Sequence, residues 1–239
     1  MLYESVIPYC GVTPVPSGIT RSWNFDPLIL AALACGYLIG GRLLTGSRRR
    51  AWFVALAVLA LIFVSPVCAL ASALFAARGF HHLAITVIVA PLIAYALPPQ
   101  RGSGAAAALG ASTGVLWLWH WPALYTAAFE SHLLYWVLQL ALLGSFVWFW
   151  RAVMSPQASP VTALMTIGAG AGQMGLLGAL LTLAPTPLYD VHGLASLPWG
   201  LDPLRDQQLA GLLMWVPAFF VYGACAILAA RRVDRAAFE

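Results

Sequence analysis

Charged residues are scarce in this chain, and lysine is missing altogether. Of 239 residues, 12 are basic, all of them arginine, and 8 are acidic, so charged residues make up 8% of the sequence, against about 25% in an ordinary soluble domain. The apolar share is 62% and the mean hydropathy is +0.85. So few charges could not cover the surface of a soluble domain, which excludes a typical cytosolic enzyme and a disordered protein. The composition predicts a polytopic membrane protein.

Several functional patterns are absent as well. The four cysteines show no CxxC spacing and do not predict a disulfide framework. The first residues lack the basic region, apolar core and cleavage site of a removable signal peptide. There is no HExxH motif, no Ser-His-acid spacing and no pair of carboxylates within an apolar run, which predicts a protein that is not an enzyme. No basic stripe with interleaved aromatic residues points to nucleic acid.

Seven apolar runs are long enough to be membrane-spanning helices, which need about 20 residues. They are predicted at 27–44, 51–76, 80–97, 104–129, 133–154, 161–184 and 207–230. In hydrocarbon, a single segment can satisfy its own backbone hydrogen bonds only as a helix, so these runs are predicted to be helical. Pro122 predicts a kink in the fourth span. The fold class is therefore an all-α integral membrane protein, a bundle of about seven helices at 27–230, with an N-terminal segment at 1–26 and a tail at 231–239.

The arginines predict the orientation of this bundle. One side receives Arg42, Arg48, Arg49, Arg50, Arg101, Arg151, Arg231, Arg232 and Arg235, and the other receives Arg21, Arg78 and Arg205. Cytoplasmic loops collect positive charge, so the C-terminal tail is predicted in the cytoplasm and the segment 1–26 outside. The expected location is the cytoplasmic (inner) membrane of a bacterium. The middles of the spans carry almost no charge, which argues against a proton-coupled carrier.

All five histidines fall at the predicted outer face of the membrane. They are His81, His82, His120, His132 and His192. Imidazole is the commonest protein ligand for copper and zinc, so a metal site at this face is a natural hypothesis.

The proposed site consists of His82, His120 and His132. His81, the thioether of Met214 and the thiol of Cys10 are possible additional ligands, and the two sulfur groups suit Cu(I) in particular.

Plainer roles stay open for the same residues. An interfacial histidine often only hydrogen-bonds a headgroup or a helix end, and His81 and His82 point about 100° apart on a helix. Arg78, four residues before His82, is an interfacial anchor or a site for an anionic lipid.

Asp206, Gln207 and Gln208 open the last span, where an acid suits the helix dipole at least as well as it suits a ligand role. Other residues in the spans are expected to pack: Cys35, Cys68 and Cys225 as small apolar groups, and Gly168, Gly170, Gly172 and Gly175 at a close helix contact.

Three segments together resemble the multi-span CtaG-like family of cytochrome c oxidase assembly factors. They read Arg-Gly-Phe-His-His-Leu with Ala-Pro-Leu at 78–92, Trp-Leu-Trp-His-Trp-Pro-Ala-Leu-Tyr at 117–125, and Asp-Pro-Leu-Arg-Asp-Gln-Gln-Leu-Ala-Gly-Leu-Leu-Met-Trp-Val-Pro at 202–217. The segments at 7–11 and 23–27 look like a bacterial branch of the family, so the resemblance covers nearly the whole chain.

The resemblance implies a role in making haem-copper oxidases by helping copper reach the enzyme. Oxidase subunits would then be partners, together with membrane lipids and a periplasmic copper chaperone as a further candidate. Many members carry two histidines four apart at the start of the third span; here Arg78 stands at the first position and His82 at the second. This departure from the family pattern weakens the inference of direct metal binding more than it weakens the inference of an association with the oxidase.

The leading hypothesis is thus an assembly factor that holds copper transiently at its periplasmic face and passes it on. The alternative is a non-catalytic accessory subunit or scaffold of a terminal oxidase or respiratory complex. A third and less favoured class is a haem- or quinone-binding electron carrier, in which His82 and His120 would ligate the haem.

Overall fold

Helices are the regular secondary structure in the part of the chain described by its structure, a computed structural model. That part covers residues 7–100, 102 and 104–237, with backbone alone for 232–237. The α-helices are α1 Pro27–Leu43, α2 Gly46–Val64, α3 Pro66–Ala73, α4 Phe75–Leu83, α5 Ala90–Ala96, α6 Ala105–Trp119, α7 Pro122–Glu130, α8 His132–Val153, α9 Pro160–Leu183 and α10 Pro203–Ala237. A π-helical turn at Ala84–Val89 joins α4 to α5, and 3-10 segments occupy Pro16–Arg21 and Asp190–Trp199.

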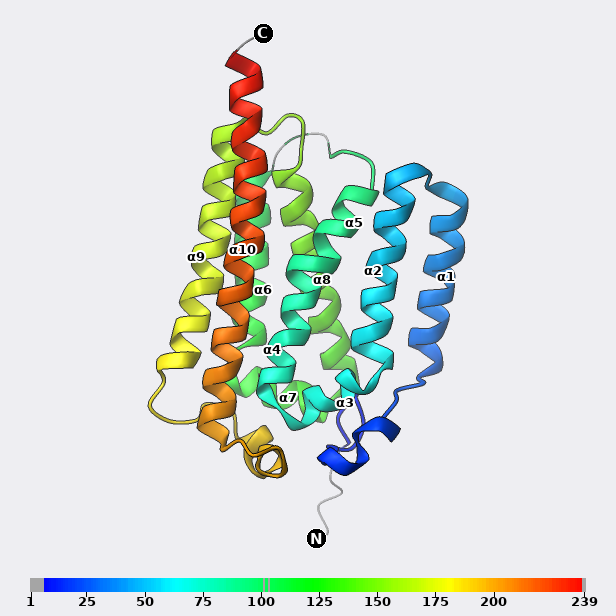
Figure 1. The fold of residues 1–239 in the computed structure, drawn as a ribbon, viewed down its shortest axis with the longest axis vertical. Coiled ribbons are helices and arrows are strands. Elements are labelled where there is room, and N and C mark those ends of the chain that lie inside the picture. The colour runs from blue at the N-terminus through cyan, green and yellow to red at the C-terminus, as the bar shows by residue number, and fades with distance from the viewer. Residues whose placement is uncertain (1–6, 101, 103, 238–239) are drawn as a thin grey trace.

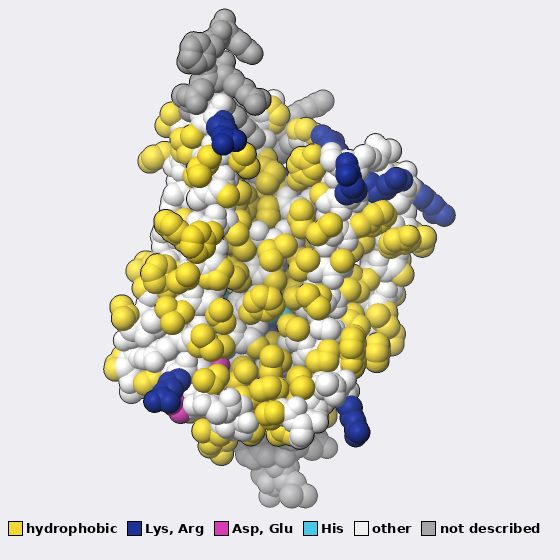
Figure 2. Space-filling view, in the orientation of Figure 1, with side chains coloured by type: hydrophobic (Ala, Val, Ile, Leu, Met, Phe, Trp, Pro, Cys, Tyr) yellow, Lys and Arg dark blue, Asp and Glu magenta, His cyan; other side chains and the backbone are white. Residues whose placement is uncertain are grey.

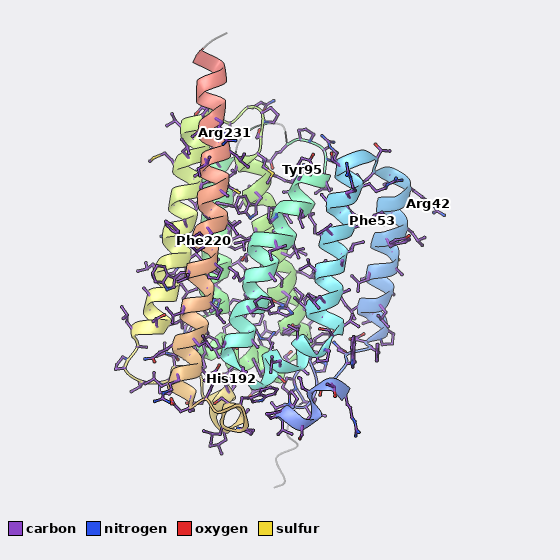
Figure 3. All side chains as sticks on the ribbon, in the orientation of Figure 1. Arg42, Phe53, Tyr95, His192, Phe220 and Arg231 are labelled. Carbon is purple, nitrogen blue, oxygen red and sulfur yellow. A yellow bond between two sulfur atoms is a disulfide. The ribbon has the colours of Figure 1, made fainter. Side chains whose placement is uncertain are left out.

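The longer helices run side by side along the long axis of the molecule, with the two chain termini at opposite ends (Figure 1). The short helices α3 and α7 and the segment Asp190–Trp199 lie at the end near the N-terminus. We call this the histidine end, because His192 lies in that segment, and we call the opposite end, with Arg42 and Arg231, the arginine end (Figure 3). The side of the molecule seen in Figure 2 is mostly apolar between the ends, as expected of a surface that faces lipid.

Four helical stretches of the described chain are long and apolar enough to cross a membrane. They are Phe75–Ala96, which combines α4, the π turn and α5, followed by His132–Val153, Pro160–Leu183 and Pro203–Arg231. The bent pair of α2 and α3 makes a fifth candidate, and α1 and α6 are shorter apolar helices at the places of the predicted first and fourth spans. The all-helical fold is thus confirmed, with four or five candidate membrane spans in the described chain, and seven spans stay a prediction.

A proline breaks the predicted second span. That span was expected to run over 51–76, but α2 ends at Val64 and α3 begins at Pro66, with a bend of 52° between them. Proline disfavours helix at the residue before it, and the Ser65 side chain accepts a hydrogen bond from the Val67 amide, which caps α3. The bend turns α3 out of the bundle axis.

A similar break at His120 and Trp121 separates α6 from α7, near the kink that Pro122 predicts.

The third span begins earlier than its sequence suggests. It was expected to start at residue 80, but α4 starts at Phe75. The carboxylate of Asp206 in α10 accepts hydrogen bonds from the amides of Phe75 (2.7 Å) and Ala76 (3.0 Å), so a residue 130 positions away caps the helix. This extension places His81 and His82 about two turns inside the helix, where both are buried.

Candidate functional site

Two buried histidines lie in contact between α4 and the end of α6. His82 is 1% exposed and His120 is 5% exposed, and their ring centres lie 5.3 Å apart with the rings almost perpendicular. The indole of Trp119 packs against His82 at 4.6 Å and is itself fully buried. The structure therefore brings together two of the three histidines that the sequence proposes as a site.

The backbone at the α6 break fixes the orientation of His120. Its Nδ1 lies 2.7 Å from the carbonyl oxygen of Leu116, and because a carbonyl only accepts, Nδ1 carries the proton and donates. In the neutral ring, Nε2 then holds a free lone pair, and this atom is buried without a hydrogen-bond partner in the described residues. Metal-binding histidines are held in the same way, with the second nitrogen donating to a carbonyl.

His82 lacks hydrogen-bond partners among the described residues at both of its ring nitrogens, whereas His120 lacks one only at Nε2. The His82 side chain is nevertheless buried. A buried polar group without a partner costs about 1–3 kcal/mol, so these unpartnered nitrogens make the His82 and His120 pair the candidate ligand site. An ion about 2 Å from a ring nitrogen lies roughly 3 Å from the ring centre, so two rings on one ion have centres at most about 6 Å apart. The observed 5.3 Å satisfies this limit.

Among the described residues, no third ligand of the usual kind accompanies the pair. Within the described residues, no group of three or more His, Cys, Asp or Glu side chains is placed to hold a metal ion. His81, although adjacent, uses its Nδ1 as an acceptor for the Gln139 amide at 3.4 Å and packs edge-on against Phe63. The divergence predicted for His81 and His82 is seen in their ring centres, which lie 6.3 Å apart.

His132 lies at the molecular surface rather than beside the pair. It is exposed at the start of α8, its Nε2 lies 2.9 Å from the Ile7 carbonyl oxygen, and its ring packs against Tyr9. These contacts hold the N-terminal segment to α8. The structure thus gives His132 a structural environment, and no described contact joins it to His82 or His120.

Cys10 was expected to offer a thiol, and this expectation needs correction. Cys10 and Cys68 form a disulfide, so neither sulfur is a thiol in this form of the protein. Cys68 was also expected to pack as a small apolar group within a span. The bend at Ser65 and Pro66 instead carries it toward the N-terminal segment. Neither the wide spacing of the cysteines nor their surroundings in the sequence signalled this pairing.

Met214 is buried in the contact between α10 and α4. A Cβ placed on Gly79 would lie 3.4 Å from Met214 Cγ, so the thioether side chain packs against the helix face that carries His82 three residues later. The structure places Met214 near the candidate site and gives no contact between its sulfur and either imidazole.

Arg78 is buried, which corrects its expected role as an anchor at the membrane surface. The side chain is 1% exposed; Nη1 donates to the Tyr135 hydroxyl at 3.2 Å, and the guanidinium lies over the rings of Phe129 and Tyr135. Its Nε has no hydrogen-bond partner in the described residues. The ion pair found among these residues joins Arg205 to Asp202 and does not involve Arg78. A permanent positive charge therefore lies one helical turn from His82.

The three polar residues at the start of α10 have mainly structural contacts. Asp206 caps α4, as described above. Gln207 accepts from the Leu188 amide at 2.6 Å and donates to the Leu181 carbonyl at 3.2 Å, which ties α10 to the end of α9. The backbone carbonyl of Gln208 accepts from the Thr182 hydroxyl. These contacts favour the structural role that the sequence left open.

Two residues near the site make contacts that the sequence did not indicate: Tyr135, which was not singled out, and His192, which was only placed at the outer face. The Tyr135 hydroxyl accepts from Arg78 and from Gln139 and so joins α4 to α8. Its position four residues before Gln139 puts the two on one helix face, which is the signal that could have found it. His192, in the segment Asp190–Trp199 (Figure 3), is hydrogen-bonded through Nε2 to the Tyr125 hydroxyl at 2.7 Å. Burial, and then the charge of Arg78, lower the pKa of His192 to about 3.

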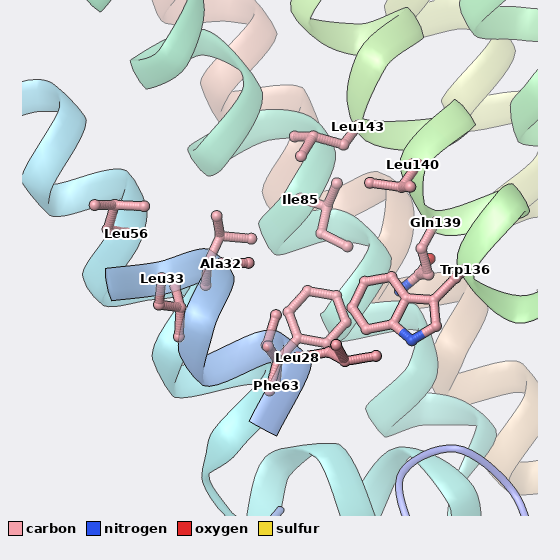
Figure 4. A pocket seen from close by; sticks show the side chains of 12 residues that line it. Leu28, Ala32, Leu33, Leu56, Phe63, Ile85, Trp136, Gln139, Leu140 and Leu143 are labelled. Carbon is pink, nitrogen blue, oxygen red and sulfur yellow. The ribbon is translucent and has the colours of Figure 1, made fainter. Parts of the chain in front are cut away.

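A separate apolar cavity of about 370 Å³ is lined in part by Phe63 and Gln139 (Figure 4). Its walls come from α1, α2, the π turn and α8, and Gln139 is its one amide side chain. Phe63 and Gln139 separate this cavity from His81, since both contact the His81 ring. The lining offers no metal ligand.

The geometry defines a class of protein: a helical membrane bundle with a buried pair of imidazoles near one end. The comparison with known families then places it. The family profile of the cytochrome c oxidase caa3 assembly factor matches residues 103–236, more than half of the chain, and the chain belongs to that family. The matched region contains His120, His132 and Met214, and the region that carries Arg78 and His82 lies before it. No curated protein and no solved structure matched the chain.

Proposed function

We propose that this protein assists the assembly of a haem-copper cytochrome c oxidase by holding copper between His82 and His120. Family membership supports the oxidase-assembly role and a non-catalytic one. The observation that supports the copper assignment is the contact between two buried imidazoles whose free nitrogens have no partner among the described residues. Copper is here the cargo of the protein.

The incomplete ligand set suits transfer. Two imidazoles leave coordination positions open, as catalytic metal sites do, and a partner could fill those positions when it takes the ion. Trp119 covers His82 and limits access to water. Neutral imidazole is the form that binds metal, and the proton on Nδ1 of His120 leaves Nε2 of the neutral ring free to do so.

Anaerobic Cu(I) loading of the purified protein tests this proposal. The wild type and a His132→Ala control are expected to retain the same amount of copper, because His132 lies at the surface. The double variant His82→Ala/His120→Ala is expected to lose it. Equal copper in all three proteins, each shown to be folded by circular dichroism, contradicts the proposed site.

The oxidase role has a separate test. Deleting the gene should lower the copper content and the activity of the terminal oxidase, and the wild-type gene should restore both. A fully metallated and active oxidase in the deletion strain contradicts the assembly role.

A second candidate function is that of an accessory subunit or scaffold. The lack of a three-ligand group in the described residues favours it. In this case, the protein would purify with the oxidase in a fixed stoichiometry, and the His82→Ala/His120→Ala variant would leave the copper content of the oxidase unchanged.

A further inference from the structure

The arginine end of the bundle contains a pocket that the proposed function does not use. Its volume is about 230 Å³. Arg48 of α2, Tyr95 of α5 and Arg151 of α8 contribute to its lining, together with the turn 97–100 that follows α5. Figure 3 shows Tyr95 at this end, together with Arg42 and Arg231, and His192 at the other.

The two arginines of the pocket have unused hydrogen-bonding capacity. Arg151 donates from Nη2 to the Pro98 carbonyl at 3.1 Å, and its Nε is buried without a partner in the described residues. Arg48 is exposed, in the first turn of α2. The positive end of the α2 dipole therefore lies beside the Arg48 charge.

No described acidic side chain lies near this pocket to balance that charge. The acids whose side chains the structure describes are Asp26, Glu130, Asp190, Asp202 and Asp206. They belong to the helix starts, loops and short helices at the histidine end (Figure 1). The electrostatics of the pocket thus favour an anion.

The residue types that line the pocket indicate which anion. Leu97, Pro98 and Met154 add apolar surface to the lining beside the arginines. The Tyr95 and Ser47 hydroxyls are hydrogen-bonded at 2.9 Å and connect the end of α5 to the start of α2. A ligand with a charged group and an adjoining apolar part would match both the arginines and the apolar part of the lining, and lipid headgroups lie at this depth when the helices span a bilayer.

We propose that this pocket binds the phosphate of an anionic phospholipid, with Arg48 and Arg151 contacting its oxygens. Arginine suits phosphate because its planar group donates two parallel hydrogen bonds. The site requires neither copper nor the oxidase, so its failure would leave the proposed function untouched.

The test is lipid binding to the full-length protein in phosphatidylcholine nanodiscs, with tetraoleoyl cardiolipin or dioleoyl phosphatidylglycerol as the added probe. Native mass spectrometry counts the bound lipid. Arg48→Gln and Arg151→Gln are each expected to weaken binding roughly fivefold to tenfold. The matched control is Arg49→Gln, which removes the same charge from the next residue of α2, outside the pocket lining, and should bind as the wild type does.

Three outcomes would overturn the proposal. The first is an equal loss in Arg49→Gln, which indicates diffuse attraction to the arginine end. The second is displacement of the lipid by inorganic phosphate at equal concentration, which assigns the pocket to the free anion. The third is unchanged binding in Arg48→Gln. The Arg48 side chain is exposed, so its replacement should not disturb the fold. This variant therefore tests the proposal even if Arg151→Gln fails to fold.

Discussion

His192 couples the stability of the histidine end to pH. Its lowered pKa of about 3 means that the folded protein keeps this ring neutral in mildly acidic solution, whereas the unfolded chain binds a proton near pH 6.5. Stability is therefore highest above about pH 6.5 and falls as the pH drops toward 3, by at most about 1.4 kcal/mol per pH unit from this group.

Thermal unfolding in detergent between pH 4 and pH 7.5 measures this dependence. His192→Gln should show a shallower fall in unfolding temperature than the wild type, because glutamine does not titrate. Parallel curves for the two proteins would show that His192 is not responsible.

Arg78 determines the charge next to His82, and its replacement should change copper affinity. Arg78→His removes a permanent positive charge and adds an imidazole four residues before His82, on the same helix face. We expect copper to bind roughly tenfold more tightly, as measured by competition with a Cu(I) chelator. Arg78→Gln removes the charge alone and should give a smaller gain; weaker binding in both variants would contradict this argument.

The residues of the site could be found from the sequence, but their surroundings could not. His82 and His120 were expected at one end of the bundle because their positions relative to the apolar runs place them there. Their depth depends on the long-range cap from Asp206 and on the α6 break, neither of which is a local signal. The Cys10–Cys68 pairing depends on the bend at Pro66, which the apolar run conceals.

At the scale of the helix, the Asp206 cap should account for a measurable part of the stability. Asp206→Asn keeps one acceptor but turns an NH₂ group toward the second of the two capped amides of α4. The expected loss is about 1–2 kcal/mol in the free energy of unfolding, measured by chemical denaturation.

Asp202→Asn is the control for this prediction. Asp202 accepts from the Arg205 amide at the start of α10, a capping role that asparagine also fills. Its exposed ion pair with Arg205 should contribute less than about 1 kcal/mol. Equal effects of the two variants would contradict the capping role of Asp206.

The contact between α9 and α10 depends on particular glycines. A Cβ on Gly178 would lie 2.7 Å from Trp215 and 2.9 Å from the Gly211 carbonyl oxygen, whereas a Cβ on Gly172 would meet nothing within 4 Å. Gly178→Ala should therefore lower the free energy of unfolding by about 1–3 kcal/mol. Gly172→Ala should be neutral or stabilising by up to about 1 kcal/mol. Chemical denaturation of both variants checks this, and equal losses would exclude close packing as the cause.

This contrast also shows how far a glycine pattern can be interpreted. The sequence suggested that Gly168, Gly170, Gly172 and Gly175 share one packing role, but only Gly170 of these four has neighbours that a Cβ would meet, at Phe149 and Tyr222. Helical position alone did not identify which side of α9 faces α10.

The limits of α8 and α9, by contrast, were predicted to within one residue, because polar or proline-containing turns bound both apolar runs.

For the whole molecule, the two ends differ in chemistry as well as in sequence position. The disulfide lies at the histidine end, and disulfides persist in oxidising compartments. It therefore favours the same orientation that the arginine count predicts, with the histidine end outside. The pocket formed by Arg48 and Arg151 lies at the opposite end, where the cytoplasmic leaflet would supply anionic lipid.

Reporter fusions in a bacterial host test this orientation and the number of spans together. Helix α1 has 17 residues, a length of about 25 Å, slightly less than the hydrocarbon thickness of about 30 Å. If α1 spans the membrane, a phosphatase that is active only outside the cytoplasm should be inactive when fused after residue 45 and active when fused after residue 131. A fluorescent protein fused at the C-terminus should fluoresce, because an odd number of spans places the two termini on opposite sides. Phosphatase activity at residue 45 would place the turn between α1 and α2 outside the cytoplasm, which would contradict the predicted orientation of the arginine end.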